Sequence, residues 1–278
     1  MSTLAGKPLF SFSIIFLYFT TTITLAQPNF ISYFCETAHN FTANSAYERN
    51  LNTTLTALPT TNSGLGFFNL STGEGDDRVN SIALCRGDIN PDECSSCLND
   101  SIAKLREICP NQKEGIGYYD NCMLRYSNAT ILGSTAIRFY VYLANPNNAS
   151  DIDQFNNALR PLMRDLRTTA AAGGPLRKFD SGNTSGPGFT TIYALVQCTP
   201  DLTELQCNNC LEDAINQIGN LLNGKVRGRI LLPMCNFRYE IYRFFNVSAL
   251  AIPPPPSSSS PPPISQSSPT IPPPPGTC

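Results

Sequence analysis

The sequence has little of what most enzymes and nucleic-acid-binding proteins require. His39 is the only histidine among 278 residues, so nucleophile systems that pair a serine or a cysteine with a histidine base have no credible base. No spacing of Asp and Glu indicates a carboxylate pair for glycoside hydrolysis. The formal net charge is −2, which gives no electrostatic footprint for nucleic acid or an anionic membrane. We therefore expect a protein that is not an enzyme and does not bind nucleic acid.

Ligands for a metal are also lacking. A C-x2-C motif can hold zinc, but a four-ligand site needs a second ligand pair at short spacing, and the sequence offers none. Redox catalysis would leave the other cysteines unexplained. We expect structural disulfides, and neither a metal nor another cofactor.

The eleven cysteines carry most of the information, because most of them repeat. The spacing C-x8-C-x2-C occurs twice, and a further cysteine follows each copy. Four pairs share one offset of 113 residues: Cys85 with Cys198, Cys94 with Cys207, Cys97 with Cys210, and Cys122 with Cys235. Such a constant offset predicts two copies of one structural unit.

The N-terminus is typical of a secreted protein. Lys7 precedes an apolar run from Leu9 to Phe19, and Thr24-Leu25-Ala26 offers small residues for cleavage, so residues 1–26 are predicted to be a signal peptide. No later segment has 18 consecutive apolar residues, so we expect no membrane span in a soluble mature chain. Secretion fits both the disulfides and the candidate glycosylation sites, which are Asn40, Asn52, Asn69, Asn99, Asn128, Asn148, Asn183 and Asn246.

Apolar periodicity predicts an α+β plan that occurs twice. Residues 45–58 read as a helix with Tyr47, Leu51, Leu55 and Leu58 on one face, and a second helix follows Asn90. Residues 67–70, 79–84, 115–126 and 135–143 read as strands. In the second copy we expect helices around residues 155–166 and after the capping box Thr203-x-x-Gln206, with strands at 227–233 and 236–247.

These elements divide the chain into four parts. A first domain is expected over residues 27–143 and a second over 144–252, with residues 145–151 as a short polar connector. Residues 253–278 are runs of Pro and Ser and predict a disordered, polyproline-type tail. We also expect the two units to share apolar surface, because the strand ends hold more aromatic residues than one sheet face would bury: Phe139, Tyr140, Tyr142, Tyr242, Phe244 and Phe245.

Unequal cysteine counts predict one disulfide. The first unit has Cys35 and Cys109, whereas the second has Leu222 in place of Cys109 and Leu143 or Ala144 near the place of Cys35. Two cysteines that are absent together are most simply a missing pair. We therefore predict a Cys35–Cys109 bridge, which packing of Leu222 must replace in the second unit.

Four further cysteines per unit allow three connectivities. Cys94 and Cys97 lie three residues apart on one helix face, where a mutual bridge would distort the turn. We favour Cys85–Cys94 and Cys97–Cys122, repeated as Cys198–Cys207 and Cys210–Cys235. Cys278 is left over, either to pair between chains or to mark a truncated gene product.

The motifs resemble a plant family, the ginkbilobin-2-type or stress-antifungal domain of cysteine-rich repeat secretory proteins. The same tandem forms the ectodomains of cysteine-rich receptor-like kinases and plasmodesmata-located proteins. The resemblance covers roughly residues 28–248 and implies two helices on a five-stranded antiparallel sheet, twice, with the disulfides favoured above. It rests on both C-x8-C-x2-C motifs and on residues 119–126 (YDNCMLRY), 193–202 (YALVQCTPDL), 228–233 (GRILLP) and 238–240 (RYE).

The resemblance also implies a sugar site. The ginkgo seed member binds mannose through an Asn, an Arg and a Glu, and the matching positions here are Asn145, Arg229 and Glu240. The first unit has Ile116 and Ser127 at the last two positions and Glu36 near the first, so it is expected not to bind. The chain has no Trp to stack on a sugar, and a cross-strand ion pair of Arg229 with Glu240 is an equally good interpretation of these residues.

The resemblance leaves two functions open. The first is a secreted, non-enzymatic apoplastic protein of defence or stress responses that binds a mannose-type glycan, a cell-wall component or a cell-surface partner. The second is a truncated receptor ectodomain that acts in signalling together with a receptor-like kinase ectodomain.

Overall fold

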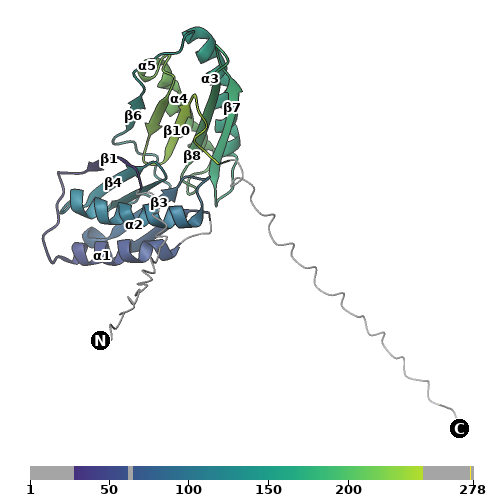
Figure 1. Cartoon of the computed structure of the whole chain (residues 1–278). Coiled ribbons are helices and arrows are strands. Elements are labelled where there is room, and N and C mark those ends of the chain that lie inside the picture. Colours follow the sequence, from purple (N-terminus) through teal and green to yellow (C-terminus); the bar gives the residue numbers. More distant parts are fainter. Residues whose placement is uncertain (1–27, 62–64, 247–275, 277–278) are drawn as a thin grey trace, which may run out of the picture.

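The computed structural model describes residues 28–61, 65–246 and 276, and shows two similar units (Figure 1). The expected signal peptide, Cys278 and all of the expected tail except Gly276 lie outside the described residues. The first unit comprises β1 (Phe30–Cys35), α1 (Ala46–Ala57), η1 (Leu58–Thr61), β2 (Phe67–Thr72), η2 (Gly75–Asp77), β3 (Val79–Cys85), α2 (Pro91–Ile108), β4 (Glu114–Tyr119) and β5 (Cys122–Ser127). The second comprises β6 (Val141–Ala144), α3 (Ile152–Ala171), β7 (Lys178–Ser185), β8 (Thr191–Cys198), α4 (Glu204–Asn216), α5 (Ile218–Leu221), β9 (Gly228–Leu231) and β10 (Cys235–Glu240).

The two sheets have the same topology. Five antiparallel strands lie in the order β1-β4-β5-β3-β2 in the first and β6-β9-β10-β8-β7 in the second. Equivalent residues also pair in equivalent register, since Cys35 lies opposite Gly115 and Ala144 lies opposite Gly228. The predicted repeat of an α+β unit is confirmed, and Ala144 is the counterpart of Cys35.

The predicted helices form because their caps and apolar stripes agree. Ser45 caps α1 and Asn90 caps α2, each by accepting a hydrogen bond from a backbone N–H three residues on. Thr203 and Gln206 form the predicted capping box of α4. The stripe of α1 is buried in the first core, and that of α3 in the second. Each helix pair thereby covers one face of its sheet.

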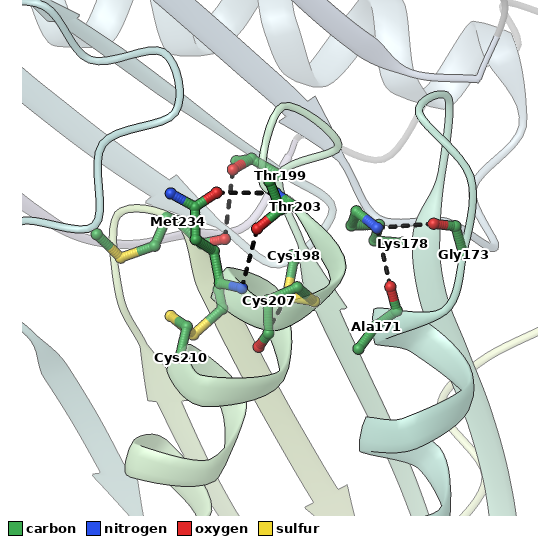
Figure 2. Close-up of a disulfide and its surroundings, with 11 residues drawn as sticks. Ala171, Gly173, Lys178, Cys198, Thr199, Thr203, Cys207, Cys210 and Met234 are labelled. Atoms are coloured by element: carbon green, nitrogen blue, oxygen red, sulfur yellow. Dashed lines mark hydrogen bonds between the residues drawn. A yellow bond between two sulfur atoms is a disulfide. The ribbon is translucent and has the colours of Figure 1, made fainter.

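The five predicted disulfides are present: Cys35–Cys109, Cys85–Cys94, Cys97–Cys122, Cys198–Cys207 and Cys210–Cys235. Figure 2 shows how one of them, Cys198–Cys207, joins the end of β8 to the first turns of α4, beside the Thr203 cap. Leu222 is fully buried in the second core, where it fills the place of the missing bridge.

A buried lysine ends the other helix of this unit. Lys178 donates hydrogen bonds to the carbonyl oxygens of Ala171, at 2.9 Å, and Gly173, at 2.7 Å, beyond the last turn of α3 (Figure 2). Burial lowers the pKa of this ammonium group. Its charge is nonetheless well placed, because a helix C-terminus carries partial negative charge and unpaired carbonyl groups.

The segment between the sheets differs from our expectation. We predicted one strand over residues 135–143 in the first unit, but only Val141–Ala144 is a strand, and it pairs with β9 of the second sheet. Residues 128–140 therefore join the two sheets, and we call them the connector. The polar residues 145–151 lie within the second unit, between β6 and α3. Alternating aromatic and β-branched residues predicted a strand but could not specify its partner.

The units share an apolar cluster, as predicted. The sheet face of the first unit that lies opposite its helices packs against the connector and against Leu231 of β9. Figure 1 shows α1 and α2 on the far side of this sheet from the second unit. Phe139 of the connector stacks on Phe34 with 4.4 Å between ring centroids. The shared surface is only partly the one expected, because Tyr140, Tyr142 and Tyr242 remain about half exposed.

Polar contacts between the two units add to this apolar interface. Gln197 donates to the carbonyl oxygen of Cys85 at 2.9 Å, and Arg86 donates to the carbonyl oxygen of Phe244 at 3.2 Å. Gly87 packs so closely on the Phe179 ring that a Cβ atom there would collide with it. None of the helices in the described ranges is long and apolar enough to cross a bilayer.

Candidate functional site

The second unit brings the three predicted sugar-binding residues together. Arg229 lies on β9, Glu240 ends β10, and Asn145 directly follows β6. In the sheet order β6-β9-β10 these strands are neighbours, so residues far apart in the sequence meet. Together the three line a cavity of about 290 Å³, near the lower end of the size typical for small-ligand pockets.

The first unit contributes to the same cavity. Its wall includes Asp120, from the turn between β4 and β5, Asn29, which directly precedes β1, and Ile31 of β1. From the second unit Leu143 adds an exposed apolar side chain. The candidate site therefore lies at the boundary between the two units. The repeat pattern did not predict that the first unit would contribute to it.

Arg229 is held by a carboxylate from the other unit. Its Nη1 lies 2.7 Å from Oδ1 of Asp120, and its Nη2 donates to the carbonyl oxygen of Tyr119 at 3.3 Å. Burial lowers the pKa of Arg229 to about 10, although Asp120 opposes that shift. In the part of the chain that the structure describes, Arg229 makes no ion pair with Glu240, so the cross-strand pair considered above is not formed.

Asp120 is the charged centre of this arrangement. Arg229 and Arg238 both contact its Oδ1, at 2.7 and 2.8 Å, and Arg86 lies 3.6 Å from its Oδ2. Burial alone would raise the pKa of this carboxyl group, but the three guanidinium groups outweigh it and lower the pKa. One carboxylate thus contacts three cations drawn from both units.

Glu240 is held by arginines of its own unit. Its Oε1 accepts from Nε of Arg238 at 2.9 Å, and its Oε2 lies 3.5 Å from Nε of Arg227. Burial raises the pKa of Glu240, while the Arg238 ion pair opposes that shift. Asn145 accepts a hydrogen bond from the Asn147 backbone through its Oδ1, at 2.7 Å, which fixes its orientation.

Two of the predicted residues carry unused hydrogen-bonding atoms. Nε of Arg229, a donor, and Oε2 of Glu240, an acceptor, are buried without a hydrogen-bond partner among the described residues. Buried polar atoms are normally paired, because an unpaired one costs about 1–3 kcal/mol. A donor and an acceptor on the wall of one cavity are suited to a ligand with hydroxyl groups.

The equivalent surface of the first unit is closed. Ile116 and Ser127 stand at the positions of Arg229 and Glu240, and both are fully buried. Phe34 is the counterpart of Leu143, and Phe139 of the connector covers it. Phe139 therefore covers the surface of the first unit that corresponds to the cavity of the second.

Sequence reasoning missed Asp120, Arg238, Arg227 and Asn29. A weak signal existed for Asp120, because it lies in a motif shared by the two units and yet Pro233 takes its place in the second. The candidate glycosylation sites lie on the surface: Asn128 is half-buried, and the others are exposed, namely Asn40, Asn52, Asn69, Asn99, Asn148, Asn183 and Asn246.

Comparison with known proteins identifies the family. Residues 34–129 and 143–242 each match the Salt stress response/antifungal domain, and together these ranges cover more than half of the chain. The chain belongs to this family. It is 38% identical over 243 residues to Cysteine-rich repeat secretory protein 38 of Arabidopsis thaliana, covering 87% of this chain and 96% of that protein.

Other relatives are receptors. Cysteine-rich receptor-like protein kinase 25 of Arabidopsis thaliana is 36% identical over 245 residues, which is 86% of this chain but 36% of the kinase. The chain thus spans about a third of the length of such receptor kinases. The tandem DUF26 ectodomain of the Arabidopsis thaliana cysteine-rich receptor-like protein PDLP8 is 25% identical, with a TM-score of 0.66, and the match covers 76% of this chain and 98% of that ectodomain. Family membership, the secretory relative and the ectodomain fold support an extracellular, stress-related protein.

Proposed function

We propose that this member of the Salt stress response/antifungal family is a secreted, non-enzymatic protein that binds a mannose-type sugar in its second unit and acts in defence or stress responses. One observation carries the proposal. Asn145, Arg229 and Glu240 line a single cavity, and among the described residues Nε of Arg229 and Oε2 of Glu240 have no hydrogen-bond partner, although Oε2 lies 3.5 Å from Nε of Arg227.

The chemistry of the cavity suits a hexose. Vicinal hydroxyl groups both donate and accept hydrogen bonds, so one hydroxyl can accept from Nε of Arg229 while its neighbour donates to Oε2 of Glu240. The amide of Asn145 adds a further polar contact. Ile31 and Leu143 offer apolar contact to the C–H groups of the ring, which partly replaces the missing tryptophan.

Mannose titration of the secreted protein tests the proposal. Glu240→Gln should weaken mannose binding by about tenfold or more, because it removes the charge from the acceptor while keeping its shape. Arg229→Ala should abolish binding, whereas changes at Ile116 should have little effect. Calorimetric titration with mannose, preceded by a glycan array, measures each.

The matched control is Glu36→Gln, at the first-unit position equivalent to Asn145. Binding should be unchanged in this variant, because Phe139 covers the first-unit surface. Equal losses from changes in the two units would contradict the assignment, as would a wild-type protein that binds no mannose.

A signalling role is the second candidate, and the likeness to the PDLP8 ectodomain favours it. In this role the chain would pair with the ectodomain of a receptor-like kinase. Transcript sequence beyond Cys278 discriminates the two candidates. An in-frame membrane span followed by a kinase would decide for the receptor, whereas a stop codon would favour the secreted protein.

A further inference from the structure

A second cavity, remote from the sugar site, lies between the helices of the second unit. It has a volume of about 400 Å³. Arg160, Arg164 and Arg167 of α3 line one side of it. The other side is formed by α4 and α5, with Glu212, Ile215, Asn216, Ile218 and Gly219. We call this feature the arginine groove.

Positive charge in the groove is under-compensated. Glu212 is the only acidic residue in its lining, and it already forms an ion pair with Arg167 at 2.8 Å. Within the described ranges Arg160 and Arg164 make no ion pair. Like charges four residues apart destabilise a helix. The groove therefore concentrates cations in a chain whose net charge is −2, so a general excess of basic residues does not explain it.

One polar atom of the groove lacks a partner. Nε of Arg167 is buried and unpaired among the described residues, although Nη1 of the same side chain binds Glu212. A buried guanidinium N–H normally finds an acceptor. The exposed side chains of Arg160 and Arg164 are free to approach a ligand, beside the Arg167–Glu212 ion pair.

The first unit does not share this groove. The buried stripes align Leu51 with Leu159, so Asn52 stands in place of Arg160, and the cysteine offset places Asn99 at the position of Glu212. Asn52 and Asn99 are both candidate glycosylation sites and both exposed. The helical face of the first unit thus offers two sites for glycans, whereas that of the second offers three arginines.

We propose that the arginine groove binds an acidic oligosaccharide, that is, a chain of sugars bearing carboxylate groups. Guanidinium groups bind carboxylates in a bidentate manner. The arginines recur at about one helical turn, about 5.4 Å, which is comparable with the length of one sugar residue. Ile215, which is half-buried, supplies apolar contact for the sugar rings. Ile218 also lines the groove but is buried in the core of the second unit.

Titration of the full secreted chain with tri-galacturonic acid tests the proposal. The acid should bind, and binding should weaken as salt is raised, because the interaction is electrostatic and exposed. The fully methyl-esterified trimer should bind at least about tenfold more weakly, which corresponds to about 1.4 kcal/mol. Equal binding of acid and ester would overturn the proposal, as would no detectable binding of the acid.

Variants locate the site. Arg160→Gln/Arg164→Gln should reduce affinity for the acid by about tenfold or more. The charge-matched control Arg49→Gln/Arg78→Gln removes two exposed cations from the first unit and should leave affinity unchanged. Equal losses of affinity in the two double variants would show that the acid is attracted by the net charge of the protein. That result would overturn the assignment of binding to the arginine groove. A tri-aspartate peptide that binds as tightly as the sugar acid would overturn the assignment to an oligosaccharide.

The sugar site supplies an independent control. Glu240→Gln should not change the affinity for the acidic trimer, because the two cavities share no lining residue. If this variant abolished binding of the acid, the acid would occupy the proposed sugar site. That result would contradict its assignment to the arginine groove.

Discussion

Asp120 is the single residue on which the geometry of the proposed sugar site depends most. Its carboxylate contacts arginines from both units and lies in the wall of the cavity. Removing one partner of a buried ion pair destabilises a protein more than the pair itself stabilises it, because the remaining charge stays buried. The counterpart residue, Pro233, cannot play this part in the second unit.

Asp120→Asn should lower the free energy of unfolding by about 2 kcal/mol, because charge-assisted hydrogen bonds to Arg229 and Arg238 are lost. Urea denaturation at neutral pH measures this change. The control Asp213→Asn changes an exposed carboxylate of α4 and should have an effect below about 0.5 kcal/mol.

The same residue gives a pH dependence. A carboxyl group whose pKa is lowered on folding stabilises the protein above the unfolded pKa of about 3.9, and this contribution is lost as the pH falls through the lower folded value. The difference in stability between the native protein and Asp120→Asn should therefore shrink below about pH 4. A difference that grows on acidification would show that Asp120 is not the acceptor of these arginines.

At the scale of elements, the two units differ in how the region after the second helix is held: the first uses a disulfide and the second uses apolar packing. In the first, the Cys35–Cys109 bridge ties β1 to the end of α2. In the second, Leu222 packs in the core beneath Gly228, and Tyr239 donates a hydrogen bond to the Leu222 carbonyl oxygen at 3.3 Å. Cysteine counting predicted both, because a disulfide and its absence are visible in sequence.

Cys35→Ser/Cys109→Ser should lower the free energy of unfolding by about 4 kcal/mol, since the bridge closes a long loop of the unfolded chain. Leu222→Ala should cost about 2–5 kcal/mol by leaving a cavity at the equivalent place. Urea denaturation of both variants compares the two devices. A double cysteine variant as stable as the native protein would contradict a stabilising role for this bridge.

At the scale of the whole molecule, the two units pack through the sheet faces that their helices leave uncovered. The face of the first sheet would be unfavourable in water, because it is lined with Ile82, Leu84, Ile116 and Tyr118. The connector and Leu231 cover it, and the contacts of Gln197 and Arg86 fix the relative position of the units. The pair should therefore unfold as one body.

Calorimetry of residues 27–252 should show one cooperative transition, and the second unit produced alone should be poorly soluble. Leu231→Asp should destabilise the whole protein, because it places a charge in the shared cluster. Leu205→Asp, at an exposed leucine of α4, is the matched control and should have little effect. Two separate transitions, with a stable isolated second unit, would rule out a shared interface.

The sequence alone determined what depends on local chemistry and on repetition. Caps and apolar periodicity placed α1, α2 and α4, and the constant cysteine offset revealed the duplication and its bridges. These features can be predicted from sequence because they depend on residues close together in the chain or on a spacing that recurs in both units. Arg229 and Glu240 were named only through the resemblance to the family, by their distances from Cys235.

Only the tertiary structure decided what depends on contact between the copies. It placed Val141–Ala144 in the second sheet, stacked Phe139 on Phe34 of the first unit, and paired Arg229 with Asp120 rather than with Glu240. The physical reason is that strand partners and ion pairs are chosen by distance in space, and a repeat describes each unit without the other. The arginine groove likewise exists only where α3 packs beside α4.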